Sequence, residues 1–210
     1  MEESALQHLD ELFASLPENS RRHSRRTGQY MRIILRQMGF DQLEEDMLWG
    51  DASPFDYHDI GKIKLPPSLL QQRWLYSHEE QLRAMAHVDY GGQIFDTLEA
   101  EAGEDANKAF FATAWQIAMF HHENFDGTGY PDGLKGEAIP FYARVCAVAN
   151  AYDGLRNGFG IFAPRAPEAA IDKMFQKSGT WFDPSIVMAL KRWVSLSPDA
   201  KTIHEPAPIH

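Results

Sequence analysis

Five of the nine histidines in this chain occur where a side chain could hold a metal ion. They come from well-separated parts of the sequence: His23, His58, His87, His121 and His122. A single histidine on a helix is more often a satisfied polar group than a ligand. Transition-metal sites in helical proteins, however, are built from side chains that project inward from several helices. The five together therefore favour an interior metal site.

Three of these histidines have a neighbour that could also bind metal. Asp59 follows His58 directly, and His121 and His122 are adjacent. Neighbouring residues on a helix point about 100° apart, so each pair suits the end of a helix, or two metal ions better than one. Imidazole and carboxylate together suit Fe, Mn, Zn and Ni alike, so the ligand types alone leave the metal open.

A run of turn-forming residues follows the histidine pair, in the sequence HHENFDGTGYPDG. Its glycines and proline bend the backbone next to residues that titrate or coordinate metals. A plain surface turn has the same composition, so this segment by itself leaves both interpretations open.

Most of the chain has the periodicity of helices. Apolar residues recur every three or four positions in segments 6–16 and 30–38, and segment 105–120 is apolar enough for a buried central helix. The pairs Asp41 with Glu44 and Ser77 with Glu80 resemble capping boxes, and Asp183 precedes a proline. No convincing alternating run occurs. We predict an all-α fold with the metal site between helices.

The size of the chain favours one domain. Its 210 residues suffice for one hydrophobic core, and no linker-like tract divides them. We divide the chain into an N-terminal helix over 1–16, the main domain over 17–195 and a tail over 196–210.

Composition limits the partners and the compartment. One cysteine, and an N-terminus without a basic start or an apolar h-region, indicate a cytoplasmic protein. No apolar run is long enough to span a bilayer. A formal charge of −10 argues against binding to a nucleic-acid polymer. The positive charge that binds an anionic substrate must therefore be local, and would come from metal cations or from the arginines of segment 21–26.

Four segments, in this order, carry a family resemblance: YHDIGKIKLP, AMAHVDYGG, HHENFDGTGYPDGLKGEAIP and ARVCAVANAYDGL. They resemble the HD-GYP subfamily of the HD phosphohydrolases, from about residue 17 to about residue 190. The resemblance implies an all-helical domain that binds two or three iron or manganese ions. It also implies hydrolysis of cyclic di-GMP to pGpG, and in some members to GMP, by a hydroxide held between the metals.

The resemblance also implies roles for individual residues, which we carry over position by position. One metal would take His23, His58, Asp59 and Asn150, and the other would take His87, His121 and His122, with Asp59 bridging. Asp59 and Lys62 would be catalytic. Arg144, Asp126, Gly129, Tyr130 and Pro131 would serve substrate binding, with Tyr130 set against a purine or a signalling protein partner.

Three positions depart from the family pattern. Asn150 stands where the family usually has Asp, so an amide replaces a charged ligand. Asn19 stands where members with three metals have Glu, so we expect two metals at most. An arginine-proline-tyrosine-basic segment is replaced by residues Phe159 to Phe162, which are apolar apart from a glycine.

These observations support two main hypotheses of different classes. The first is a metal-dependent phosphodiesterase acting on a cyclic dinucleotide, most plausibly cyclic di-GMP. The second is a catalytically degenerate module that binds a nucleotide or a signalling partner through the Tyr130 loop. A third, weaker hypothesis is an HD phosphohydrolase for another phosphate ester.

Overall fold

The computed structural model describes residues 2–40, 42–70, 76–158 and 163–196. These residues form helices and loops, with two isolated bridges, Trp49 with Ala52 and Ser178 with Phe182, in place of strands. The all-α prediction is thus confirmed. The apolar segment 159–162 and the tail from residue 197 lie outside the described residues.

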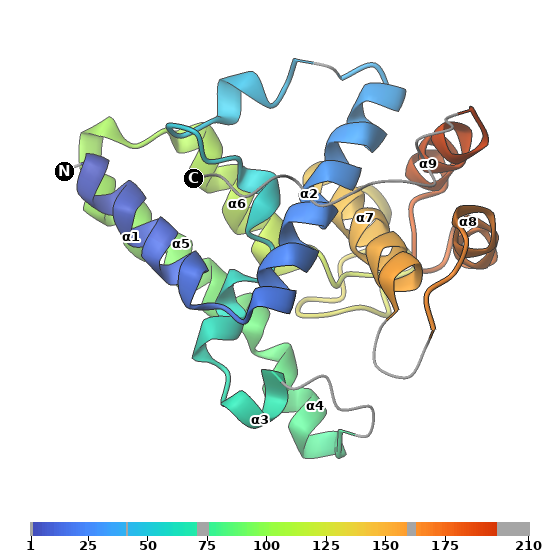
Figure 1. The fold of residues 1–210 in the computed structure, drawn as a ribbon, viewed down its shortest axis with the longest axis horizontal. Coiled ribbons are helices and arrows are strands. Elements are labelled where there is room, and N and C mark those ends of the chain that lie inside the picture. Colours follow the sequence, from blue (N-terminus) through green and yellow to red (C-terminus); the bar gives the residue numbers. More distant parts are fainter. Residues whose placement is uncertain (1, 41, 71–75, 159–162, 197–210) are drawn as a thin grey trace.

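The described helices follow one another along the chain as numbered in Figure 1. The α-helices are α1 (Glu2–Ser15), α2 (Glu18–Gln37), α3 (Pro67–Leu70), α4 (His78–Met85), α5 (His87–Ala102), α6 (Lys108–Phe120), α7 (Phe141–Asn157), α8 (Pro167–Phe175) and α9 (Pro184–Leu196). Short 3-10 helices are η1 (Glu45–Met47), η2 (Pro54–Asp56), η3 (Ile60–Lys64), η4 (Gly103–Asp105) and η5 (Gly136–Ala138).

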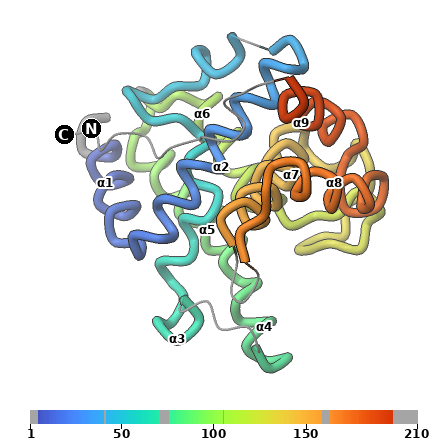
Figure 2. The backbone as a smooth tube through the Cα atoms, turned by 45° about the vertical axis from the view of Figure 1, so that its right-hand side comes forward, coloured from blue at the N-terminus to red at the C-terminus, as the bar shows by residue number. Residues whose placement is uncertain are grey.

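The helices pack in two groups with α2 between them. On one side α1 lies along α5, which also packs on α6 and η3 (Figure 1). On the other side α2 packs on α7 and α9, and α8 packs on both of these helices. Figure 2 shows the same arrangement from another angle, with α3 and α4 projecting together from the body.

Each group of helices has its own buried apolar cluster. Leu9 and Phe13 of α1 are buried together with residues of α5 and α6, such as Phe95 and Phe110. The N-terminal helix therefore shares a core with the rest of the domain. The second cluster lies between α2, α7, α8 and α9. Among the described residues no helix is both long enough and apolar enough to cross a bilayer.

Local signals set the starts of α4 and α9. Ser77 and Glu80 form the predicted capping box of α4, and the Asp183 side chain accepts the backbone N–H of Ser185 at the start of α9 at 2.8 Å. The capping box predicted for Asp41 and Glu44 stays a prediction; the Glu44 carboxylate accepts from Arg32 Nε at 2.7 Å, and the 3-10 helix η1 follows. Asp41 lies outside the described residues.

One glycine lets the segment after Asp59 approach α5 closely. A Cβ at Gly61 would lie 2.0 Å from the carbonyl oxygen of His87 and 2.4 Å from the backbone nitrogen of Gly91. Both neighbours are backbone atoms, so neither can move aside as a flexible side chain could. Gly61 thus sets the distance between η3 and the start of α5.

We expect Gly61→Ala to lower the free energy of unfolding by at least about 2 kcal/mol, because the new methyl group forces these backbones apart. Gly154→Ala is the matched control: a Cβ there meets nothing within 4 Å, and alanine favours the helix by up to about 1 kcal/mol. Urea denaturation measures both changes. Equal stability of the Gly61 variant and the unmutated protein would contradict this account.

Candidate metal centre

The candidate histidine ligands and Asp59 come from four separate places in the fold. His23 lies within α2, and His87 is the first residue of α5. His58 and Asp59 lie between η2 and η3, and His121 and His122 follow the last residue of α6. Both adjacent pairs therefore lie at helix ends, as the divergence of neighbouring side chains requires.

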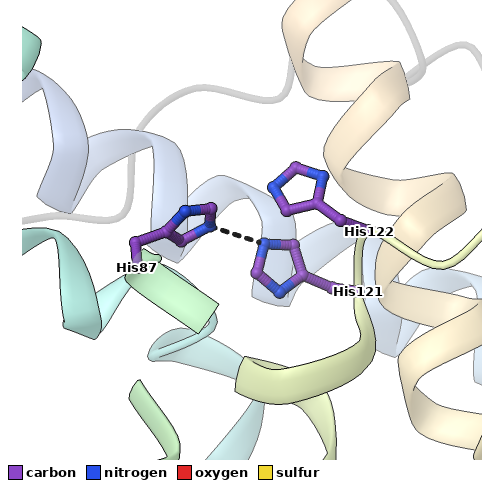
Figure 3. A group of neighbouring side chains, drawn as sticks. All are labelled: His87, His121 and His122. Carbon is purple, nitrogen blue, oxygen red and sulfur yellow. Dashed lines mark hydrogen bonds between the residues drawn. The ribbon is translucent and has the colours of Figure 1, made fainter. Parts of the chain in front are cut away.

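The side chains gather in two groups. His87, His121 and His122 form one group, and His23, His58 and Asp59 form the other. Within each group one ligand atom of every residue lies within 4.8 Å of the others. Figure 3 shows the first group, with the rings of His87 and His121 facing each other and their Nε2 atoms 3.4 Å apart.

The carboxylate of Asp59 lies between the two groups. Its Oδ2 atom is 3.4 Å from His58 Nε2 and 3.7 Å from His23 Nε2. Its Oδ1 atom is 3.5 Å from His87 Nε2 and 3.8 Å from His121 Nε2. Each oxygen thus faces one group, which is the arrangement of a carboxylate that bridges two cations.

Hydrogen bonds on the far side of three rings fix their orientation. The Nδ1 atom of His87 donates to the carbonyl oxygen of Ala84 at 2.7 Å, and that of His121 donates to the carbonyl oxygen of Ile117 at 2.9 Å. His23 Nδ1 is 2.6 Å from a carboxylate oxygen of Asp153. With the proton on Nδ1, each Nε2 lone pair points to Asp59 and is able to bind metal.

Polar atoms left without partners support a cation at this site. Both ring nitrogens of His58 and the Oδ1 atom of Asp59 are buried without a hydrogen-bond partner. An unpartnered buried polar atom costs free energy, more so when it carries charge. Convergent imidazoles and a carboxylate without donors between them fit divalent cations, so the residues present suit the metals that the sequence predicts.

Burial favours the neutral form of His58, His87 and His121, the form in which imidazole binds metal. It lowers the pKa of His87 to about 4 and holds the pKa of His58 and His121 below the ordinary value. For Asp59, burial acts to raise the pKa, but Lys62 and His58 outweigh it and hold that pKa well below its usual range. Asp59 is therefore a carboxylate at neutral pH.

Lys62 is the cation closest to this carboxylate. Its Nζ atom donates to Asp59 Oδ2 at 2.5 Å, from one turn further along η3. Its side chain is 28% exposed, whereas that of Asp59 is 2% exposed. Lys62 therefore reaches from the buried carboxylate to the open side of the site.

Helix α7 contributes one residue that the sequence predicted and one that it missed. Asn150 lines the same cavity as His23 and Asp59. Asp153, which was not predicted, accepts from His23 Nδ1 and from two guanidinium nitrogens of Arg26 at 2.6 and 3.0 Å. An acid one turn after a suspected ligand on the same helix was the available sequence signal.

The turn after the histidine pair packs directly on the site. The ring of Tyr130 stacks on that of His122, with centroids 4.7 Å apart and an angle of 18° between the planes. A Cβ at Gly129 would lie 2.5 Å from the carbonyl oxygen of His122, so only glycine fits there. The buried Glu123, also missed, accepts the backbone N–H of Asp132 at 2.8 Å and so ties the turn together.

Three predicted substrate residues lie elsewhere. Arg144 Nη1 donates to Asp183, and its Nε donates to the carbonyl oxygen of Ile139 at 3.0 Å. Asp126 accepts from the backbone and hydroxyl of Thr128. The three described cavities next to the histidines are lined by none of Arg144, Asp126 and Pro131. Their roles toward substrate stay predictions.

Three cavities meet at His122. A polar cavity of about 510 Å³ includes Asn19, Arg22, His23, Lys62, Asn150 and Asp153 in its wall. An apolar cavity of about 380 Å³ lies between η3, α3, α4 and Tyr130. A third cavity of about 370 Å³ lies beneath the Gly129–Tyr130 turn and reaches Trp181. The site therefore has room for an extended ligand.

The chain is similar in sequence to proteins named as cyclic dinucleotide phosphodiesterases. The chain is 33% identical over 160 residues to the cyclic di-GMP phosphodiesterase response regulator RpfG of Xanthomonas campestris, covering 76% of this chain and 39% of the relative. It is 30% identical over 172 residues to 3'3'-cGAMP-specific phosphodiesterase 2 of Vibrio cholerae, covering 81% of this chain and 31% of the relative. The chain thus spans well under half the length of these curated relatives.

A solved structure and a family model agree with the fold. Bd1817, a HDG"Y"P protein from Bdellovibrio bacteriovorus, superposes with a TM-score of 0.60 at 20% identity, covering 82% of this chain and 51% of that chain. The family model described as an HD domain matches residues 7–186. Because that match includes both histidine groups and the turn after them, the resemblance seen in the sequence is confirmed and the chain belongs to the HD domain family.

Proposed function

We propose that this chain hydrolyses a phosphodiester bond of a cyclic dinucleotide, with cyclic di-GMP as the first candidate and pGpG and GMP as products. The observation that carries the proposal is the Asp59 carboxylate, with one oxygen toward each histidine group. The names of the relatives, which are phosphodiesterases for cyclic di-GMP or 3'3'-cGAMP, give the substrate class.

The centre would hold two divalent metal ions, iron or manganese. His23, His58, Asp59 and Asn150 would hold one, and His87, His121, His122 and Asp59 the other. Bound there, such cations would supply an activated water at neutral pH and would offset the negative charge on the phosphoryl oxygens. No serine or cysteine nucleophile is then required, which agrees with the inert environment of Cys146, a thiol whose pKa burial raises well above its ordinary value.

The remaining roles belong to side chains around the phosphorus atom. The oxygen of water forms a bond to phosphorus, the bond to the 3′ oxygen breaks, and that oxygen takes up a proton. Lys62 lines both the polar and the apolar cavity, so its ammonium would bind a non-bridging phosphate oxygen. Asp59 holds this ammonium in place at 2.5 Å.

The turn of Gly129, Tyr130 and Pro131 would close one side of the substrate site. Tyr130 already stacks on His122 with one ring face, so its other face would meet the substrate. A signalling protein partner at this turn, and substrate contacts of Asp126 and Arg144, remain proposals that rest on the family resemblance.

The first prediction tests metal and turnover together. Protein purified under reducing conditions with added Mn²⁺ or Fe²⁺ should hold about two equivalents of metal and convert cyclic di-GMP to pGpG, as chromatography of the products would measure. His121→Ala should lower kcat/KM by at least a factor of about 100, while His8→Ala, on the surface of α1 beside Glu101, should have no effect. Metal-free protein without hydrolysis, despite added metal, would contradict the proposal.

The second prediction concerns the missing charge at position 150. We expect Asn150→Asp to raise metal occupancy, because a unit charge about 4 Å from a cation contributes up to roughly 4 kcal/mol at an effective dielectric constant near 20. Gln176→Glu adds the same charge at the exposed C-cap of α8 and should leave occupancy unchanged. Metal analysis measures both, and unchanged metal content in Asn150→Asp would mean that this residue is not a ligand.

The third prediction separates the two histidine groups. Asp153 holds the ring of His23 but touches none of His87, His121 and His122 through a described hydrogen bond. Asp153→Asn should therefore lower the affinity for one of the two metals by a factor of about 10–100 and leave the affinity for the other unchanged. A Mn²⁺ titration would resolve the two affinities, with Asp172→Asn on the exposed face of α8 as control. An equal loss of affinity for both metals would contradict the assignment of His23 and Asp153 to one metal alone.

A further inference from the structure

The apolar cavity next to the metal centre has walls unlike those of the polar cavity. Its lining includes Leu65, Leu69, Leu70, Tyr76, Ala84 and Met85. With a volume of about 380 Å³, it falls within the range of small-molecule sites, about 300–1,000 Å³. Apart from the histidines, Lys62 is the one ionisable cation among the described residues that line it.

This cavity joins the polar cavity at the place where the phosphodiester would lie. The two share Ser20, Lys62 and His122. The polar cavity carries Arg22, Arg26 and Asp153 on its side of these shared residues. A ligand bound across the shared residues would therefore have one part in charged surroundings and another between aliphatic side chains.

The walls of the apolar cavity are tied to the metal ligands. The Tyr76 hydroxyl donates to the carbonyl oxygen of Leu69 at 2.7 Å, which joins α3 to the segment before α4. At the other end of α4, the carbonyl oxygen of Ala84 accepts from His87 Nδ1 at 2.7 Å. The same turn of α4 thus orients a metal ligand and carries the cavity-lining Met85.

We propose that the apolar cavity of Leu65, Leu69, Leu70, Tyr76, Ala84 and Met85 binds a purine base of the substrate. The inference rests on the proposed function, which supplies a ligand with both phosphates and bases. Purines have flat apolar faces that pack on aliphatic and aromatic side chains. Phosphate and ribose, which need charged and hydrogen-bonding partners, fit the polar cavity across Lys62.

A direct test uses the methyl group of Met85 as a probe of the base. Protein labelled with ¹³C-methyl methionine and loaded with Zn²⁺, a diamagnetic ion that suits imidazole ligands, is titrated with GMP and with ribose 5-phosphate. The Met85 signal is assigned through Met85→Leu. We expect GMP at millimolar concentration to shift it and ribose 5-phosphate to leave it in place. Met188, 48% exposed on α9, is the internal control.

A matched pair of variants tests the contribution of the cavity to affinity. Met85→Asn introduces a neutral polar group into the wall, and Leu82→Asn makes the same change on α4 at a side chain that is 53% exposed and does not line the cavity. We expect Met85→Asn to weaken cyclic di-GMP binding about tenfold, within the range of single base-stacking contacts. Leu82→Asn should stay within about twofold, with metal content unchanged in both variants.

The outcomes separate this inference from the proposed function. A Met85 signal that responds equally to GMP and ribose 5-phosphate, or to neither, overturns the base site even where cyclic di-GMP is hydrolysed. Equal binding by Met85→Asn and Leu82→Asn overturns it as well. A shift specific to GMP together with weaker binding by Met85→Asn supports it even in a protein that turns over no substrate.

Discussion

The buried carboxylate of Asp59 is the constraint on which the rest of the site depends. A carboxylate that is 2% exposed is stable as an anion only when positive charge or donors surround it. Lys62 donates to one oxygen, while the other faces His87 and His121 without a hydrogen-bond partner. Neutral imidazoles fixed by backbone carbonyls offer lone pairs rather than N–H groups. The arrangement is therefore complete only with cations between the carboxylate and the rings.

The fold brings the ligands together by close backbone contact rather than by long side chains. Gly61 lets η3 approach α5, so the loop that carries Asp59 lies against the first turn that carries His87. Gly129 does the same for the turn after α6, where its neighbours are the backbone atoms of residues 122–124. Glycines in the family motifs thus act as spacers that set the ligand positions, a role their turn propensity alone does not describe.

The sequence predicted residue types and local structure better than pairings between distant segments. The helices and the candidate metal-ligand histidines follow from periodicity and motif, because both are encoded over a few neighbouring residues. The contact between His23 and Asp153, 130 residues apart, has no such local signature. The contact between Arg32 and Glu44 likewise joins two segments that no local pattern pairs. Such charge pairs form between distant segments in the folded chain, so local propensity does not predict them.

The charge balance of the centre explains what Asn150 changes. Asp153 is on the same helix, but its carboxylate is bound by Arg26 and His23, so it does not replace the missing acid. Counted over the proposed metals and ligands alone, two divalent cations and Asp59 would give a formal charge of 4 − 1 = +3, whereas an aspartate at 150 would give +2. The extra positive charge weakens retention of the cations but strengthens attraction of a phosphodiester. In the proposed centre Asn150 would therefore favour substrate binding at the expense of metal affinity.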